Sequence, residues 1–63
     1  MNMFELSKQV LTKVSFDKTL FKKELKKSLK WLKKEEALLL KIWCLTTFVQ
    51  YSDAIREVYE TWR

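Results

Sequence analysis

The chain has 63 residues, 48% of them hydrophobic and 33% charged, with a formal net charge of +5 at pH 7. This length allows one domain with a small core, and an aromatic content of 14% is too high for a disordered chain. The sequence has no glycine and no proline, which disfavours tight β-hairpin turns, whereas leucine, lysine and glutamate favour helices. We therefore predict an all-α fold, a small helical bundle that forms a single domain over residues 1–63.

Several classes of enzyme and metal protein are excluded by composition. There is no histidine, which is the commonest general base and metal ligand, and no glycine-rich loop that could bind a phosphate. The single cysteine, Cys44, lies in an apolar stretch and is expected to be buried as a small hydrophobic side chain. The sequence predicts a protein that is not an enzyme and has no catalytic residue, cofactor or metal.

Residues 3–14 have the apolar periodicity of an amphipathic first helix. The amino-terminal residues lack the basic start and long apolar run of a secretory signal, and no apolar run approaches about 20 residues. The expectation is a soluble, cytoplasmic protein.

The stretch VSFDKTLF, residues 14–21, has the pattern of a helix start. Asp17 is expected to be the N-cap, and Phe16 and Phe21 occupy the two positions of a hydrophobic staple. The second helix is predicted from about Lys18 to Leu32, with Phe16 and Phe21 both in the core.

Residues 35–62 are predicted to form one long third helix. Glu35 and Glu36 suit its first turn, where they meet the positive end of the helix dipole. One apolar stripe continues over its whole length, formed by Ala37, Leu40, Cys44, Phe48, Tyr51, Ile55, Val58 and Trp62. Ser52 and Asp53 could instead cap a separate fourth helix, which is the alternative. In either case the third helix is expected to fold back on the second as an antiparallel hairpin.

The first half of this helix, residues 35–49, is apolar nearly all round. It carries a second stripe, formed by Leu38, Ile42, Leu45 and Val49. Two short helices are expected to cover these two stripes, which leaves Leu39 and Trp43. We predict that Leu39 and Trp43 form a partner interface, in a homodimer or with another protein. The alternative is that the first helix covers both side chains.

The second helix is strongly basic. Residues 17–34 hold eight lysines and two acidic residues, Asp17 and Glu24, a local net charge of +6. The simplest interpretation is a solvated face, and the candidate anion-binding residues are Lys22, Lys26, Lys30 and Lys33. Non-specific binding to nucleic acid is the alternative function, and an acidic protein is a further alternative partner. Sequence-specific base recognition is not expected, because residues 18–34 contain no arginine, asparagine or glutamine. A membrane partner is disfavoured, because the second helix must cover the third.

Overall fold

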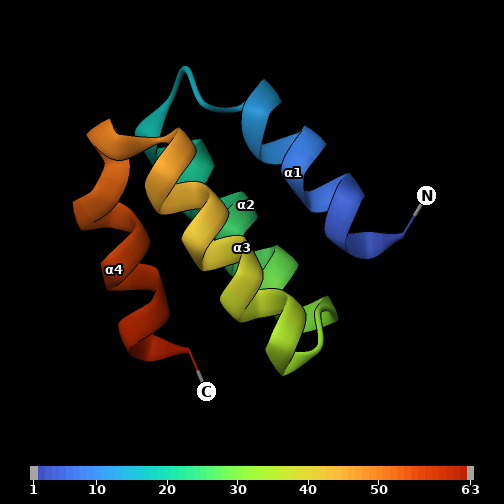
Figure 1. The fold of residues 1–63 in the computed structure, drawn as a ribbon. Coiled ribbons are helices and arrows are strands. Elements are labelled where there is room, and N and C mark those ends of the chain that lie inside the picture. Colours follow the sequence, from blue (N-terminus) through green and yellow to red (C-terminus); the bar gives the residue numbers. More distant parts are fainter. Residues whose placement is uncertain (1, 63) are drawn as a thin grey trace.

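The structure is a computed structural model that describes residues 2–62. Its elements are α1 (Met3–Lys13), α2 (Lys18–Trp31), α3 (Lys34–Thr47), one turn of 3-10 helix, η1 (Val49–Tyr51), and α4 (Ser52–Thr61) (Figure 1). Within this described part of the chain there is no β-strand. The predicted all-α class is therefore confirmed.

The start of α2 follows the predicted capping pattern in part. The Asp17 carboxylate accepts hydrogen bonds from the backbone N–H groups of Thr19, at 2.9 Å, and Leu20, at 3.2 Å. Phe21 is fully buried, but Phe16 is 79% exposed, so the prediction that Phe16 belongs to the core is wrong. The backbone N–H of Asp17 donates to the Val14 carbonyl at 3.1 Å. This tight turn leaves the Phe16 side chain on the outside of the bend.

The prediction of a single long helix over residues 35–62 is wrong. The helical backbone ends at Thr47, and Phe48 has φ −117° and ψ 61°. Three of the four residues 46–49 are the β-branched Thr46, Thr47 and Val49, which lower helix propensity at this point. A fourth helix begins at Ser52, as in the alternative prediction, although no side chain caps it.

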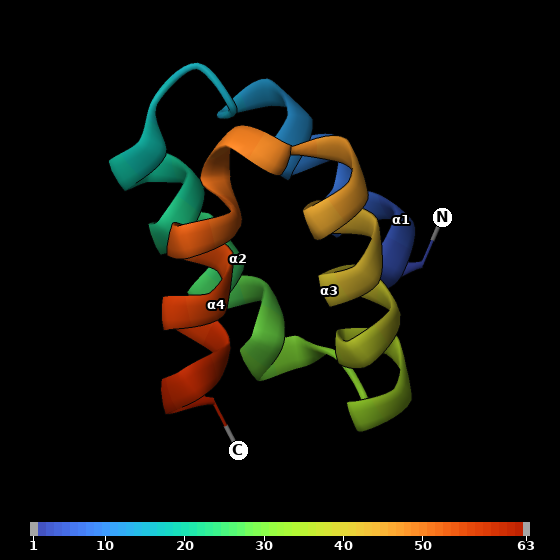
Figure 2. The ribbon, with the colours of Figure 1, turned by 60° about the vertical axis from the view of Figure 1, so that its left-hand side comes forward.

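The four helices form a bundle with α2 and α4 on one side and α1 and α3 on the other (Figure 2). The main neighbours of α2 are α1 and α4, and those of α3 are α4, η1 and α1. The structure does not confirm the predicted direct hairpin of the second and third helices. α2 and α3 instead face each other across the core.

The core is built from side chains of every helix. The buried apolar residues in one cluster are Leu11, Phe21, Leu25, Leu29, Leu32, Ala37, Leu40, Cys44, Phe48, Ile55, Val58 and Tyr59. The Phe21 ring packs against Phe48 with the ring centroids 5.0 Å apart. The Tyr59 hydroxyl donates to the Ala37 carbonyl at 2.6 Å, which ties α4 to α3. The radius of gyration is 10.3 Å, close to about 10.6 Å expected for a folded domain of this length.

Candidate functional site

α3 has one apolar face that no other element of residues 2–62 covers. Leu38, Leu39 and Ile42 are 44%, 56% and 62% exposed, and Thr46, one turn further along, is also exposed. Residues three and four apart lie on the same side of a helix, so these side chains form one continuous surface. We call Leu38, Leu39, Ile42 and Thr46 the α3 outer face.

None of the four residues of the α3 outer face is charged, but the exposed Glu35 precedes Leu38 and Leu39 by three and four residues and borders the face at its amino-terminal end. After the first turn of α3, its one charged residue is Lys41, which is half-buried and directed toward α4. Its ammonium group lies over the ring of Tyr59, 5.6 Å from the centroid. The opposite side of α3 is fully buried through Ala37, Leu40 and Cys44. α3 therefore has one side in the core and an apolar side in solvent, which Glu35 borders at its amino-terminal end.

The two predicted interface residues differ in their surroundings. Leu39 lies on the α3 outer face and is more than half exposed. Trp43 is half-buried and packs edge-to-face on Phe48, with the ring centroids 5.3 Å apart. The Lys8 ammonium group, from α1, lies 5.7 Å from the centroid of the Trp43 indole. Trp43 is thus partly covered by α1, as in the alternative interpretation, whereas Leu39 is not.

Leu38 and Ile42 were not among the residues that the sequence singled out. They belong to the second apolar stripe of α3, and the expectation that short helices would cover this stripe is wrong for them, as it is for the exposed Val49. The signal that could have identified them is the number of elements available. Because residues 35–62 form two helices instead of one, α4 packs on the part of the first stripe that belongs to α3. Within residues 2–62, no further helix is then available to cover the second stripe.

Cys44 is buried as predicted, with no exposed surface. Burial raises the pKa of its thiol to about 12. Since the thiolate is the reactive form of cysteine, a neutral and inaccessible thiol cannot act as a nucleophile. Cys44 therefore contributes packing to the core.

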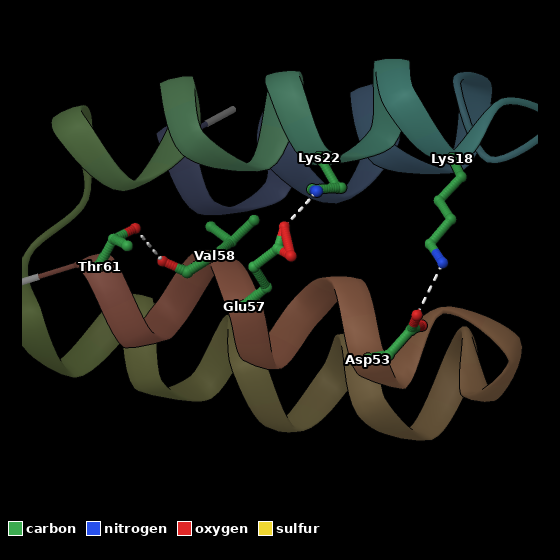
Figure 3. A network of polar contacts seen from close by, with 6 residues as sticks. All are labelled: Lys18, Lys22, Asp53, Glu57, Val58 and Thr61. Carbon is green, nitrogen blue, oxygen red and sulfur yellow. Dashed lines mark hydrogen bonds and ion pairs between the residues drawn. The ribbon is translucent and has the colours of Figure 1, made fainter.

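The predicted anion-binding lysines do not form one unpaired row. Figure 3 shows two lysines of α2 that reach α4, where Lys18 contacts Asp53 at 2.7 Å and Lys22 contacts Glu57. The hydrogen bond from Lys22 lowers the pKa of Glu57. The charge of Lys22 is therefore paired with a carboxylate of α4. The exposed residues Lys26, Lys30 and Lys33 form no ion pair with another described residue.

Comparisons of the chain with protein-family models, with curated proteins and with solved structures found no match. Over residues 2–62, no helix combines the length and the apolar character that a membrane span requires.

Proposed function

We propose that this protein is a small non-enzymatic interaction module that forms a homodimer through the α3 outer face. The observation that carries the proposal is the exposure of three neighbouring apolar side chains, Leu38, Leu39 and Ile42, on one side of α3. A contiguous apolar patch of this kind is typical of a surface that binds another protein.

The charge distribution favours a second copy of the chain as the partner. α2 (Lys18–Trp31) carries six lysines and one glutamate, a net charge of +5 that equals the net charge of the whole chain. Because α2 and α3 lie on opposite sides of the core (Figure 2), two copies that meet through α3 keep their α2 helices apart. At an ionic strength of about 0.1 M, salt screens the repulsion between charges that are more than about 10 Å apart, so the two α2 helices would repel each other only weakly. An apolar helix face also matches itself across a twofold axis, which is the commonest symmetry of dimers.

The size of the patch predicts a weak dimer. An apolar patch of about 300–600 Å², the typical maximum for a monomer, would bury about 600–1,200 Å² in a dimer, which is below the about 1,200–2,000 Å² of stable specific interfaces. We expect a dissociation constant in the micromolar range and a reversible equilibrium between monomer and dimer. The proposal places the protein in the cytoplasm, where its free cysteine stays reduced.

Analytical ultracentrifugation of the wild type and two matched variants tests this proposal. Ile42→Gln replaces an apolar side chain on the α3 outer face, and Leu6→Gln replaces an exposed apolar side chain on α1. Glutamine is a good helix former, so neither change should weaken its helix. Burying one such side chain contributes about 1.5–3 kcal/mol. Ile42→Gln is thus expected to weaken association by about tenfold or more, whereas Leu6→Gln leaves it unchanged.

Two results would refute the homodimer. One is a wild type that stays monomeric up to millimolar concentration. The other is a dimer that Ile42→Gln does not weaken, which would assign self-association to a different surface. Trp43→Ala is a poorer probe, because it also removes the ring contact with Phe48 and so lowers stability.

A further inference from the structure

A groove with a volume of about 740 Å³ lies between the second half of α2, the start of α3 and the last turn of α4. None of the residues that line it belongs to the α3 outer face, so the groove is a separate feature of the molecule. Its volume is within the range of about 300–1,000 Å³ that is typical of small-molecule sites.

One wall of the groove is apolar. Its most accessible part is the half-buried Trp62, which follows α4, and behind it lie the nearly buried side chains of Leu29, Leu32 and Val58, which also belong to the core. Trp62 is half-buried and packs edge-to-face on Tyr59, with the ring centroids 5.6 Å apart. The indole therefore has a fixed support on one side while part of its surface remains available to a ligand.

The rim of the groove is entirely basic. Lys26 and Lys30, one helical turn apart on α2, line it together with Lys34 at the start of α3. Of the described residues that line the groove, none is acidic, and none of these three lysines has an ion pair with a described residue. The Glu57 carboxylate outside the groove is held by Lys22 (Figure 3), and the charge of Lys26 also lowers the pKa of Glu57, so Lys30 and Lys34 are the lysines of the rim least affected by that carboxylate.

The remaining lining residue, Thr61, does not offer a free donor. Its hydroxyl donates a hydrogen bond to the Val58 carbonyl at 3.0 Å (Figure 3). The polar contacts that the groove can make with a ligand are therefore dominated by ammonium groups, and these recognise negative charge.

We propose that this groove binds an amphipathic anion, a single aliphatic chain that carries a carboxylate or phosphate head group. The head group would contact Lys26, Lys30 and Lys34, and the chain would lie along Leu29, Leu32 and Trp62. A free phosphate would use the lysines alone, and exposed charges of this kind are screened by salt. A neutral alcohol would use the apolar wall alone. The pairing of a basic rim, whose three lysines form no ion pair with a described residue, with an apolar wall is complementary to a ligand that has both parts.

The direct test is an NMR titration of the isotope-labelled protein with decyl phosphate below its micelle concentration. The three tryptophan indole N–H signals report the location of the ligand. We expect the Trp62 signal to shift on binding, together with the backbone signals of Lys30 and Thr61, while the Trp43 signal stays unchanged. Each methylene group that is fully buried raises affinity about fourfold. A series from octyl to dodecyl phosphate should therefore bind with increasing affinity, by about two- to fourfold per methylene.

Matched ligands separate the two parts of the site. Inorganic phosphate lacks the chain and decanol lacks the charge, and each is expected to bind at least about tenfold more weakly than decyl phosphate. Vesicles of anionic phospholipid, compared with neutral vesicles, test whether the same head-group chemistry is recognised in a membrane. Binding to monomeric decyl phosphate but not to vesicles assigns the groove to free ligands. Binding to monomeric decyl phosphate and also to anionic vesicles would mean that the groove recognises membrane lipids as well as free ligands.

Matched variants test the residues. Lys30→Gln removes one charge from the rim, and Lys23→Gln removes an exposed charge from α2 outside the groove. Lys30→Gln should weaken decyl phosphate binding by about two- to fivefold, whereas Lys23→Gln should leave it unchanged. Both changes are on the surface, and circular dichroism would verify the fold.

Four results would overturn the proposal. If decanol binds as tightly as decyl phosphate, the lysines contribute nothing to binding. If inorganic phosphate binds as tightly as decyl phosphate, the apolar wall contributes nothing. Signal changes centred on Ile42 would place the ligand on the α3 outer face. Binding to vesicles without binding to monomeric decyl phosphate would indicate surface attraction to a membrane. The proposal is independent of the homodimer, because Ile42→Gln should leave decyl phosphate binding unchanged.

Discussion

Cys44 and Tyr59 are two ionisable side chains that the fold keeps neutral. Burial raises the pKa of the Cys44 thiol to about 12, and it also raises the pKa of the Tyr59 hydroxyl. In both cases desolvation disfavours the charged form. The Tyr59 hydroxyl is at the same time held by the Ala37 carbonyl, so the neutral form has a defined partner.

The stability of the protein should therefore fall at alkaline pH. Above about pH 9 the unfolded chain releases the thiol proton while the folded chain keeps it, so the unfolded state binds fewer protons and the free energy of unfolding decreases with pH. The slope from Cys44 approaches about 1.4 kcal/mol per pH unit. Urea unfolding of the wild type and of Cys44→Ala across this range measures the effect. Cys44→Ala should lower stability at neutral pH but show a shallower alkaline slope, and parallel slopes would contradict the assignment.

The helices are defined by local signals of unequal strength. The start of α2 could be predicted from Asp17, because its carboxylate accepts hydrogen bonds from backbone N–H groups only two and three residues further along the chain. The break between α3 and α4 was predicted only as the alternative, since the apolar stripe through Cys44, Phe48 and Ile55 keeps its spacing across it. Two helices that meet at a turn and face one core produce the same pattern as a single amphipathic helix. The three β-branched residues at 46–49 were the available local signal.

The capping role of Asp17 gives a prediction for α2. Asp17→Ala removes both hydrogen bonds to the first turn and should lower the free energy of unfolding by about 1 kcal/mol. Asp17→Asn keeps a side-chain oxygen at the cap and should retain most of the stability. Thermal unfolding followed by circular dichroism measures both variants, and an equal loss in the two would indicate that charge, not capping, is responsible.

The candidate site was predicted only in part, because exposure depends on which elements are neighbours. Leu39 is exposed among the described residues, in agreement with the reasoning that left it uncovered, and the same reasoning placed Trp43 beside it, while the interface role of both stays a prediction. Trp43 instead contacts Phe48 and lies under Lys8. The sequence shows that α3 is apolar all round, but it does not specify that α1 covers the Trp43 side and leaves Ile42 exposed. The groove beside Trp62 likewise depends on the packing of α4 on α2.

At the scale of the whole molecule, the small core leaves little reserve of stability. A domain of 63 residues has a free energy of unfolding of about 3–9 kcal/mol. The ion pairs between α2 and α4 are exposed and add little to this total. Most of the stability therefore depends on the apolar cluster around Phe21.

Two phenylalanines that are five residues apart test this dependence. Phe21→Ala removes a fully buried ring that packs on Phe48 and Tyr51, and should cost about 3–5 kcal/mol. The variant should be largely unfolded at 25 °C or unfold at a much lower temperature than the wild type. Phe16→Ala removes an exposed ring and should change stability by less than about 0.5 kcal/mol. A comparable loss in both variants would contradict the placement of Phe16 outside the core.

The pairing of α1 with α2 and of α3 with α4 has a consequence for the speed of folding. Each pair is joined by a short connection, so a large part of the native contacts form between segments that are close in the sequence. Little chain entropy is lost in bringing such segments together, and helical proteins of this kind cross their folding barrier in microseconds to milliseconds. The apolar side chains of the core are then exposed to water, and to other chains, for only a brief time after the polypeptide begins to fold.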